Sequence, residues 1–182
     1  MRTALLVIDV QESFRLRDSW ADISAPDIAE RVARLVEHAR GAGQEVVWVL
    51  HSEPGTGTVF DPTLGHVRLM GGLEPQEGEL QVTKTTHNPF TSTDLGQQLT
   101  ARGVDEVVVT GIRTEQCCET TARVASDLGY RVRFVVDATA TTPLERWGGE
   151  GTLSTAEVVE RTASALQGRF ADVVTIADVL AA

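Results

Sequence analysis

The sequence predicts an α/β fold: a three-layer αβα arrangement around a mostly parallel, doubly wound sheet. Short apolar runs rich in β-branched residues alternate with amphipathic stretches along the chain, which is the pattern of successive β-α-β units. The length of 182 residues fits a single domain over residues 1–182, and neither a repeat nor a linker divides it. Because β-α-β crossovers are right-handed, they are expected to place helices on both faces of the sheet.

The first half of the chain is expected to form three strands and one long helix. Ala4–Val10 is a short apolar run typical of a strand buried on both faces. Pro26–Ala42 carries apolar residues at helical spacing. Glu45–Leu50 and Leu80–Thr83 are the second and third predicted strands. Between them, Ser52–Glu79 holds six glycines and three prolines, so it is either a functional loop (a lid or a subunit contact) or a plain surface excursion.

The second half continues the same alternation of helix and strand. The predicted helices cover about residues Ser92–Ala101, Glu115–Leu128 and Ser154–Leu166, and the predicted strands are Glu106–Thr110, Arg131–Val136 and Asp172–Ile176. The carboxyl ends of all these parallel strands would meet at one edge of the sheet, which is where ligands bind in such folds.

Composition excludes several classes of partner. The net charge of −10 argues against nucleic acid and against an anionic membrane surface, so a small-molecule substrate is expected. No apolar run is long enough to span a membrane, and the N-terminus does not read as a signal peptide. Cys117 and Cys118 are adjacent, which disfavours a disulfide between them and indicates a reducing, cytoplasmic setting. Two cysteines are also too few for a cysteine-rich zinc site.

Two charged residues fall at predicted strand ends, where they would meet. Asp9 is an acid in an apolar strand, so burial should raise its pKa and suit it to act as a general base, unless it caps a neighbouring loop. Lys84 is the single lysine among 16 basic residues. It would support an ionised Asp–Cys pair, although a lone lysine can also be a chance surface residue.

Cys117 follows a glycine-led turn at the start of a predicted helix. Free backbone N–H groups and the helix dipole there would lower the thiol pKa and hold an oxyanion. The alternative is a buried structural cysteine. Cys118 points about 100° away on a helix and is assigned to core packing.

These residues stand in segments that resemble a known family. Asp9 in LLVIDVQESF, Lys84 in VTKTTHNPF and Cys117 in VVVTGIRTEQCCETTARVASDLGYRVRFVVDA are similar to the isochorismatase-like superfamily of cysteine hydrolases, in order and spacing from Ala4 to Thr142. The resemblance implies the isochorismatase-like, Rossmann-like topology and a homo-oligomer, either a dimer or a tetramer.

The resemblance also implies roles for these residues. Cys117 would attack the carbonyl carbon of an amide and form a covalent intermediate, Asp9 would take the thiol proton and later activate water, and Lys84 would support the pair. The backbone N–H groups of Arg113 and Cys117 would form the oxyanion hole, with a cis peptide just before Arg113. Gln11 and Phe14 would lie beside the pocket.

Further residues are weaker candidates for the site. Thr114 in the cysteine motif and Trp147 in a later loop are candidates for substrate binding, and Trp147 would wall the pocket unless it anchors its loop or a subunit contact. Asp137 is expected to cap the loop that follows it. His87 and Phe90, just after Lys84, are lesser pocket candidates, and His38, on a predicted solvent-facing helix, is expected to take no part.

Two departures from the family narrow the expected chemistry. Nicotinamidases of the superfamily bind a metal through an Asp-x-His pair and further histidines, but here the segment reads Val49–Leu50–His51 and the next histidine is His66. No metal and no cofactor are therefore expected, and His51 is assigned a structural or pocket role. Isochorismatases that cleave a vinyl ether lack the cysteine, so the presence of Cys117 disfavours that activity.

The sequence thus favours a cysteine hydrolase of a C–N bond in a small amide, carbamoyl or ureido compound, acting through a thioester-type intermediate. The alternative is a non-catalytic ligand-binding or thiol redox-sensing domain on the same fold. A dinucleotide-binding oxidoreductase is set aside, because the first strand leads into DVQESF and not into a G-x-G-x-x-G turn.

Overall fold

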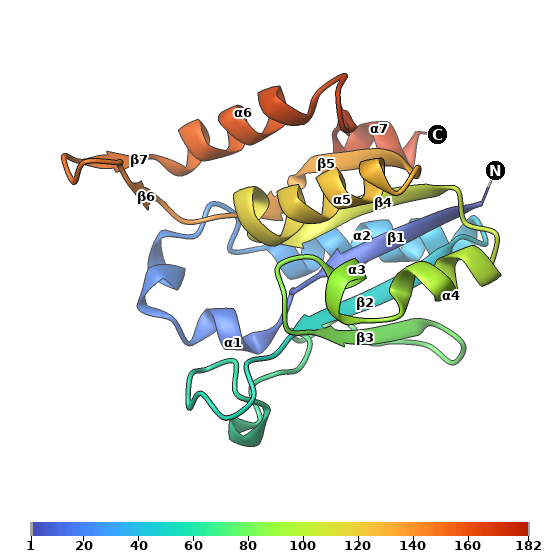
Figure 1. Ribbon diagram of the computed structural model, residues 1–182, viewed down its shortest axis with the longest axis horizontal. Helices are drawn as coiled ribbons and strands as arrows, with labels where there is room; N and C mark the ends of the chain where they lie inside the picture. The colour runs from blue at the N-terminus through green and yellow to red at the C-terminus, as the bar shows by residue number, and fades with distance from the viewer. Residues whose placement is uncertain (1, 182) are drawn as a thin grey trace.

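The computed structural model describes residues 2–181, and its centre is a six-stranded parallel sheet (Figure 1). Every neighbouring pair of strands is parallel, in the order β3-β2-β1-β4-β5-β8. The strands are β1 (Thr3–Ile8), β2 (Glu45–His51), β3 (Leu80–Lys84), β4 (Glu106–Ile112), β5 (Arg131–Ala140) and β8 (Asp172–Val174). The predicted fold class is confirmed.

The order of the strands fixes where a ligand can bind. From β1 the chain moves outward through β2 to β3, then returns to the other side of β1 and continues through β4 and β5 to β8. The direction of winding therefore reverses between β1 and β4. A crevice forms at the carboxyl ends of the strands at such a reversal, and it is the usual ligand site of open α/β sheets.

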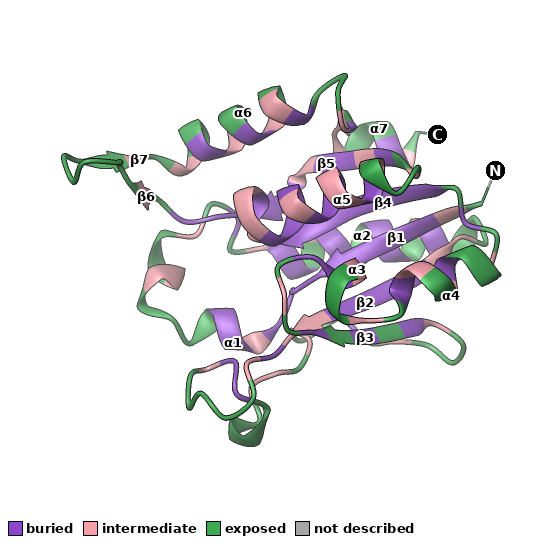
Figure 2. Ribbon diagram, viewed as in Figure 1, coloured by how far each residue is buried: buried purple, intermediate pink, exposed green. Residues whose placement is uncertain are grey.

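Helices cover both faces of the sheet (Figure 1). One face packs against α2 (Ile28–Gly41) and α7 (Ile176–Leu180), and the other against α3 (Pro89–Ser92), α4 (Leu95–Ala101), α5 (Glu119–Asp127) and α6 (Thr155–Leu166). Strand β1 serves both layers, because Leu5 and Val7 point to the first core while Leu6 and Ile8 point to the second. The continuous apolar run of this strand follows from burial on both faces (Figure 2).

Two predicted elements differ in extent from the structure. The single helix expected over Ser92–Ala101 is two short helices, α3 and α4, because Thr93 is extended between them and its hydroxyl accepts the Leu95 N–H. The last strand stops at Val174, because Thr175 caps the N-terminus of α7 instead of continuing the strand.

Several short elements were not predicted. They contain two to five residues each, too few for a periodic pattern to stand out. These are α1 (Glu12–Arg15), the 3-10 helices η1 (Asp18–Asp22) and η2 (Pro62–Leu64), the hairpin strands β6 (Leu144–Glu145) and β7 (Thr152–Leu153), and α7.

The Ser52–Glu79 segment lies against the carboxyl end of β1. Met70 donates its backbone N–H to the Val10 carbonyl at 3.0 Å, and Leu69 forms an antiparallel bridge with Gln11. The segment therefore covers the edge of the sheet at which the winding reverses.

The β6–β7 hairpin extends away from the rest of the structure, between β5 and α6 (Figure 1). Among residues 2–181, no helix is both long enough and apolar enough to cross a membrane.

Candidate active site

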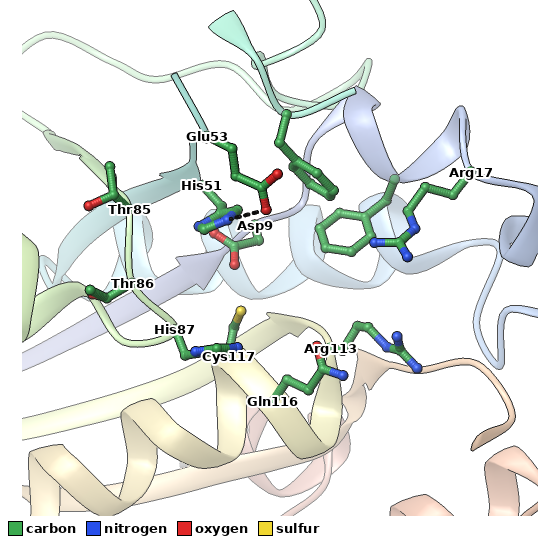
Figure 3. Close-up of a pocket in the computed structure, with 12 residues that line it drawn as sticks. Asp9, Arg17, His51, Glu53, Thr85, Thr86, His87, Arg113, Gln116 and Cys117 are labelled. Atoms are coloured by element: carbon green, nitrogen blue, oxygen red, sulfur yellow. Dashed lines mark hydrogen bonds and ion pairs between the residues drawn. The ribbon is translucent and has the colours of Figure 1, made fainter. Parts of the chain in front are cut away.

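A cavity of about 220 Å³ opens where the winding of the sheet reverses (Figure 3). Its walls come from the segments that follow four neighbouring strands. These are Asp9, Phe14 and Arg17 after β1; His51, Glu53 and Phe60 at and after the end of β2; Thr85, Thr86 and His87 after β3; and Arg113, Gln116 and Cys117 after β4.

Lys84 joins the predicted catalytic residues at the floor of this cavity. Its ammonium nitrogen Nζ lies 2.7 Å from Asp9 Oδ2, 3.6 Å from Cys117 Sγ and 3.4 Å from His51 Nδ1. The side chain is completely buried, and an ammonium group has three protons to donate. Since three acceptors surround it, Lys84 can remain charged out of contact with water.

The third contact fixes the state of His51. If Lys84 donates to Nδ1, the imidazole must be neutral and carry its proton on Nε2. That nitrogen lies 3.3 Å from the Glu53 carboxylate, which accepts the proton. Burial and the nearby Lys84 charge both lower the pKa of His51 from its ordinary value of 6.5, in agreement with the neutral form. His51 is thus a pocket residue that holds Lys84 in place.

Asp9 has one carboxylate oxygen free. Its backbone adopts φ of 55°, in the left-handed region, while its N–H bonds the Val49 carbonyl at the end of β2. Oδ2 accepts from Lys84, but Oδ1 is buried and has no hydrogen-bond partner among residues 2–181. The carboxylate faces Cys117 across the cavity (Figure 3). Burial raises the pKa of Asp9, as predicted, and Lys84 counteracts part of that rise.

The segment that presents Cys117 has an unusual backbone. Strand β4 ends in a cis peptide between Ile112 and Arg113, which is the bond that the family resemblance implied. A π-helical turn, η3 (Thr114–Cys118), follows, and α5 begins only at Glu119. The Thr121 hydroxyl donates to the Cys117 carbonyl at 2.6 Å and ties the turn to α5. The helix predicted from Glu115 therefore starts four residues later than expected.

The expected lowering of the Cys117 pKa is wrong. Cys117 is only 8 % exposed, and burial together with the negative Asp9 raises the pKa of its thiol to about 12. Lys84 opposes this rise without cancelling it. The loss of solvent around the sulfur outweighs the stabilisation of the thiolate that was expected from the helix terminus. At neutral pH the free protein therefore holds a protonated thiol, which faces the Asp9 carboxyl group.

Gly111 makes the close approach of β4 to β1 possible. It has φ of +127°, and a Cβ placed on it would overlap the backbone carbonyl of Ile8. We expect Gly111→Ala to lower the free energy of unfolding by about 3–5 kcal/mol, because strain in the backbone adds to the steric overlap. Urea denaturation followed by circular dichroism measures this. Gly129→Ala is a control: it shares a positive φ of 92° but has open space around its Cβ position, so it should lose less stability. Equal losses would show that the approach to Ile8 contributes nothing.

The side chain of Arg113 is held on one edge. Its Nη2 donates to the Thr142 hydroxyl at 2.7 Å, and its Nε lies 3.2 Å from a Glu115 oxygen. Thr141 donates to the other oxygen of Glu115. The residues after β5 therefore fix the orientation of a guanidinium group that lines the cavity.

The four substrate-binding candidates divide into one that lines the cavity and three that do not. Phe14 lines it and contacts Phe60 edge to face, with ring centres 5.0 Å apart. Gln11 is buried beneath it, where its amide bonds the backbone N–H and carbonyl of His51 and clamps β1 to β2. Thr114 is also buried and donates to Thr139, so it joins β5 instead of facing the cavity.

Trp147 does not wall the pocket. It lies in the β6–β7 hairpin and is fully exposed, at 102 % of the reference area. The sequence placed this loop correctly after β5 but carried no information on the direction in which the hairpin leaves the sheet.

The lesser candidates also have definite positions. His87 lines the cavity, whereas Phe90 stacks on Tyr130 outside it. Asp137 does not cap the following loop; it accepts the Ile176 N–H and so caps α7. Cys118 is fully buried in the core, as expected, and both cysteines are free thiols.

Sequence reasoning missed six residues that line the cavity: Arg17, Glu53, Phe60, Thr85, Thr86 and Gln116. Five of them lie in irregular segments, where no periodicity shows the direction of a side chain. Gln116 stands next to Cys117, and Thr85 and Thr86 follow Lys84, so their positions beside predicted catalytic residues were the available signal. Among residues 2–181, no group of three or more His, Cys, Asp or Glu side chains is arranged to hold a metal ion.

Comparison with known proteins identifies the family. The family model of the Isochorismatase domain matches residues 3–178, nearly the whole chain. The chain belongs to the isochorismatase family. This agrees with the family resemblance of the three sequence segments. The general activity class of the family is hydrolysis.

Individual members of the isochorismatase family are similar over most of the chain. A streptothricin hydrolase of Streptomyces noursei is 39% identical over 76% of this chain, which spans about half (49%) of that protein. Nicotinamidase 3 of Arabidopsis thaliana is 36% identical over 76% of this chain and 73% of its own length. A crystal structure of a putative hydrolase of the family from Chromobacterium violaceum matches with a TM-score of 0.92 at 29% identity, covering 99% of this chain and 92% of that one.

Proposed function

We propose that this isochorismatase-family protein is a cysteine hydrolase that cleaves a C–N bond in a small amide, carbamoyl or ureido compound. The observation that supports it is the contact of Lys84 with both Asp9 and Cys117 at the floor of the cavity. A nucleophile, a base with a free oxygen and a fixed positive charge are the groups that amide cleavage needs.

The first half of the reaction forms a thioester. Oδ1 of Asp9 takes the thiol proton as Sγ of Cys117 forms a bond to the substrate carbonyl carbon. The negative charge moves to the carbonyl oxygen, where the backbone N–H groups of Arg113 and Cys117 stabilise it. When the oxyanion collapses, the C–N bond breaks and the nitrogen leaves with the proton that Asp9 had accepted.

The second half releases the acid. Asp9, again a carboxylate, removes a proton from a water molecule as the water oxygen attacks the thioester carbon. The C–S bond breaks, and Cys117 recovers the proton. Lys84 keeps its charge throughout and stabilises the carboxylate and the developing thiolate in turn. The raised thiol pKa fits this order, because the proton leaves only when a substrate is present to be attacked.

The proposed reaction uses neither a metal nor a cofactor, and its substrate is neither nicotinamide nor isochorismate. In place of the metal-binding Asp-x-His pair of nicotinamidases the chain has Val49–Leu50–His51. His51 is already occupied by Lys84 and Glu53. A redox-sensing role is less well supported, because a sensor needs an accessible thiolate and Cys117 is neither exposed nor acidic.

We also propose that the protein acts as a homo-oligomer, either a dimer or a tetramer. The fully exposed Trp147 on the extended β6–β7 hairpin supports a contact between subunits there. Sedimentation of the parent chain beside Trp147→Ser tests this, and a monomeric parent chain would contradict it.

The test of the proposed activity is ammonia release from a panel of primary amides, carbamoyl amines and ureido acids. Turnover of one class, retained after treatment with a chelator, is the expected result. No turnover across the panel would instead favour the non-catalytic ligand-binding or thiol-sensing alternative.

The neutral state of His51 predicts how the activity falls on the acid side of the pH–activity profile (its acid limb). We expect kcat/KM to fall as the pH drops below about 6.5, because a protonated imidazole cannot accept from Lys84 and places a second positive charge beside it. Asp9 must also be ionised, so its raised pKa adds to the same limb. Glu53 is the remaining charged group in contact with His51.

A substitution separates the two titrating groups. The amide of His51→Gln can accept from Lys84 and donate to Glu53 without titrating, so the loss of activity at low pH should become less steep, because Asp9 alone then determines it. His38→Gln, on α2 away from the cavity, is the matched control. An identical limb in His51→Gln and the parent chain would exclude His51 as the cause.

A further inference from the structure

Two arginine side chains lie on one side of the cavity, away from Thr85 and Thr86 (Figure 3). Arg17 reaches it from the turn after α1, and Arg113 from the cis peptide at the end of β4. The chain as a whole has a net charge of −10. Two positive groups lining one cavity are therefore an exception to the overall charge. The ion pair with Glu115 offsets part of the Arg113 charge, whereas Arg17 has no ion pair among residues 2–181.

Both guanidinium groups have donors left for a ligand. No carboxylate among residues 2–181 forms an ion pair with Arg17, whose guanidinium carbon lies 5.9 Å from the centre of the Phe60 ring. Arg113 donates through Nη2 to Thr142 and forms an ion pair with Glu115, 3.2 Å from Nε, that lacks hydrogen-bond geometry. Its Nε and Nη1 have no hydrogen-bond partner among the same residues. The anchored edge makes Arg113 a rigid fork, which is the geometry that binds a carboxylate with two hydrogen bonds.

The acids that line the cavity have partners other than the two arginine side chains. Asp9 is neutralised by Lys84 at 2.7 Å and faces Cys117 (Figure 3). Glu53 lies beside His51, and it accepts from the Thr58 hydroxyl at 2.8 Å and from His51. The Thr58 hydrogen bond is the main cause that lowers the pKa of Glu53, and the charge of Arg17 contributes to it without forming an ion pair. Neither carboxylate therefore occupies the donors of Arg17 or Arg113.

We infer that Arg17 and Arg113 form an anion-binding subsite and that the substrate is a small amide carrying a carboxylate or another anionic group. The inference rests on the proposed function for the amide end of the substrate. The amide carbonyl lies at Cys117, the anionic group lies between the two guanidinium groups, and Phe14 and Phe60 contact the carbon chain that joins them.

Cys117 itself can report the charge of the cavity, without a known substrate. Three methanethiosulfonate reagents serve as probes, with an ethylsulfonate, an ethyl or an ethylammonium group. In each, the thiolate forms a disulfide with the ethylthio sulfur and expels methanesulfinate. Every variant also carries Cys118→Ala, so that one thiol remains. The readout is the rate with the anionic reagent divided by the rate with the neutral one, compared with the same ratio for 2-mercaptoethanol.

We expect this ratio to exceed the value for the free thiol and to fall about three- to tenfold in Arg17→Gln or Arg113→Gln. Arg17→Lys should restore most of it, and added salt should reduce it more in the parent chain than in Arg17→Gln or Arg113→Gln. The ratio for the cationic reagent should change in the opposite direction. Arg34→Gln, an exposed arginine on α2, removes the same charge outside the cavity and should leave the ratio unchanged.

An unchanged ratio in Arg17→Gln would overturn the inference, whether or not Arg113→Gln folds, and so would a preference for the cationic reagent. The outcome is separable from the test of the proposed function. A charge preference without turnover of any amide would contradict the hydrolase proposal alone, and turnover without a charge preference would contradict the subsite alone.

Discussion

Cys117→Ala should lose at least about 10⁴-fold in turnover of whichever amide the parent chain cleaves, because no other group in the cavity can form the thioester. The neighbouring Lys84 and Asp9 remain paired without the thiol. The variant should therefore fold with unchanged secondary structure and still bind substrate. Steady-state ammonia release and a substrate titration of the inactive variant measure the two effects separately.

The adjacent cysteine is the matched control for this variant. Cys118→Ala removes a thiol that is fully buried in the core and has no contact with Asp9 or Lys84. We expect it to keep its activity while losing about 1 kcal/mol in the free energy of unfolding, through the small cavity it leaves. Full activity in Cys117→Ala would contradict the nucleophile assignment, and loss of activity in both variants would point to damage of η3 instead.

Lys84→Met should be strongly destabilising as well as inactivating. It leaves the Asp9 carboxylate fully buried without its ion-pair partner, and removing one member of a buried pair costs about 3–5 kcal/mol. The pKa of Asp9 should rise further, so that the carboxyl group is protonated at neutral pH and cannot act as a base. Turnover should therefore fall together with the denaturation midpoint in urea.

The double variant Asp9→Asn with Lys84→Met separates lost charge pairing from lost packing. With both charges removed, no unpaired ion is left, so the combined loss of stability should be smaller than the sum of the single losses. The deficit of Lys84→Met should also shrink as the pH falls towards the ordinary carboxyl pKa, because Asp9 must take up a proton when this variant folds and that uptake costs less at lower pH. Strictly additive losses, independent of pH, would show that the Asp9–Lys84 contact does not contribute to stability.

The sequence predicted the sheet and the residues at its carboxyl edge because both depend on local patterns. Apolar runs identify strands that are buried on two faces, and a polar residue at the end of such a run has to lie at the edge. Asp9, Lys84 and Cys117 are therefore found from the sequence and a family motif. The helices α3 and α4 are separated at Thr93, whose hydroxyl accepts from the Leu95 N–H and donates to the Pro89 carbonyl, and no periodicity reveals this break.

The predictions that were wrong concern properties that depend on the three-dimensional surroundings of a residue. The pKa of Cys117 follows from how much solvent is removed and from the distance to Asp9, neither of which is local in sequence. Trp147 was assigned to the wall of the cavity by its position after β5, but the direction of the hairpin decides its exposure. Arg17 and Phe60 enter the cavity through turns whose course depends on packing against the sheet.

The positions of the cavity residues along the chain affect how such a protein can evolve a new substrate specificity. The proposed reacting groups Asp9 and Lys84 stand at the ends of β1 and β3, and Cys117 stands on the short turn after β4, whereas Arg17, Glu53 and Phe60 stand on longer connecting segments. Apart from Arg113, which shares the segment of Cys117, the residues proposed for recognition are therefore encoded in stretches separate from those proposed for the chemistry. A connecting segment can vary in length or composition while the sheet holds the nucleophile, the base and the ammonium group in register, so new specificities can arise without rebuilding the catalyst.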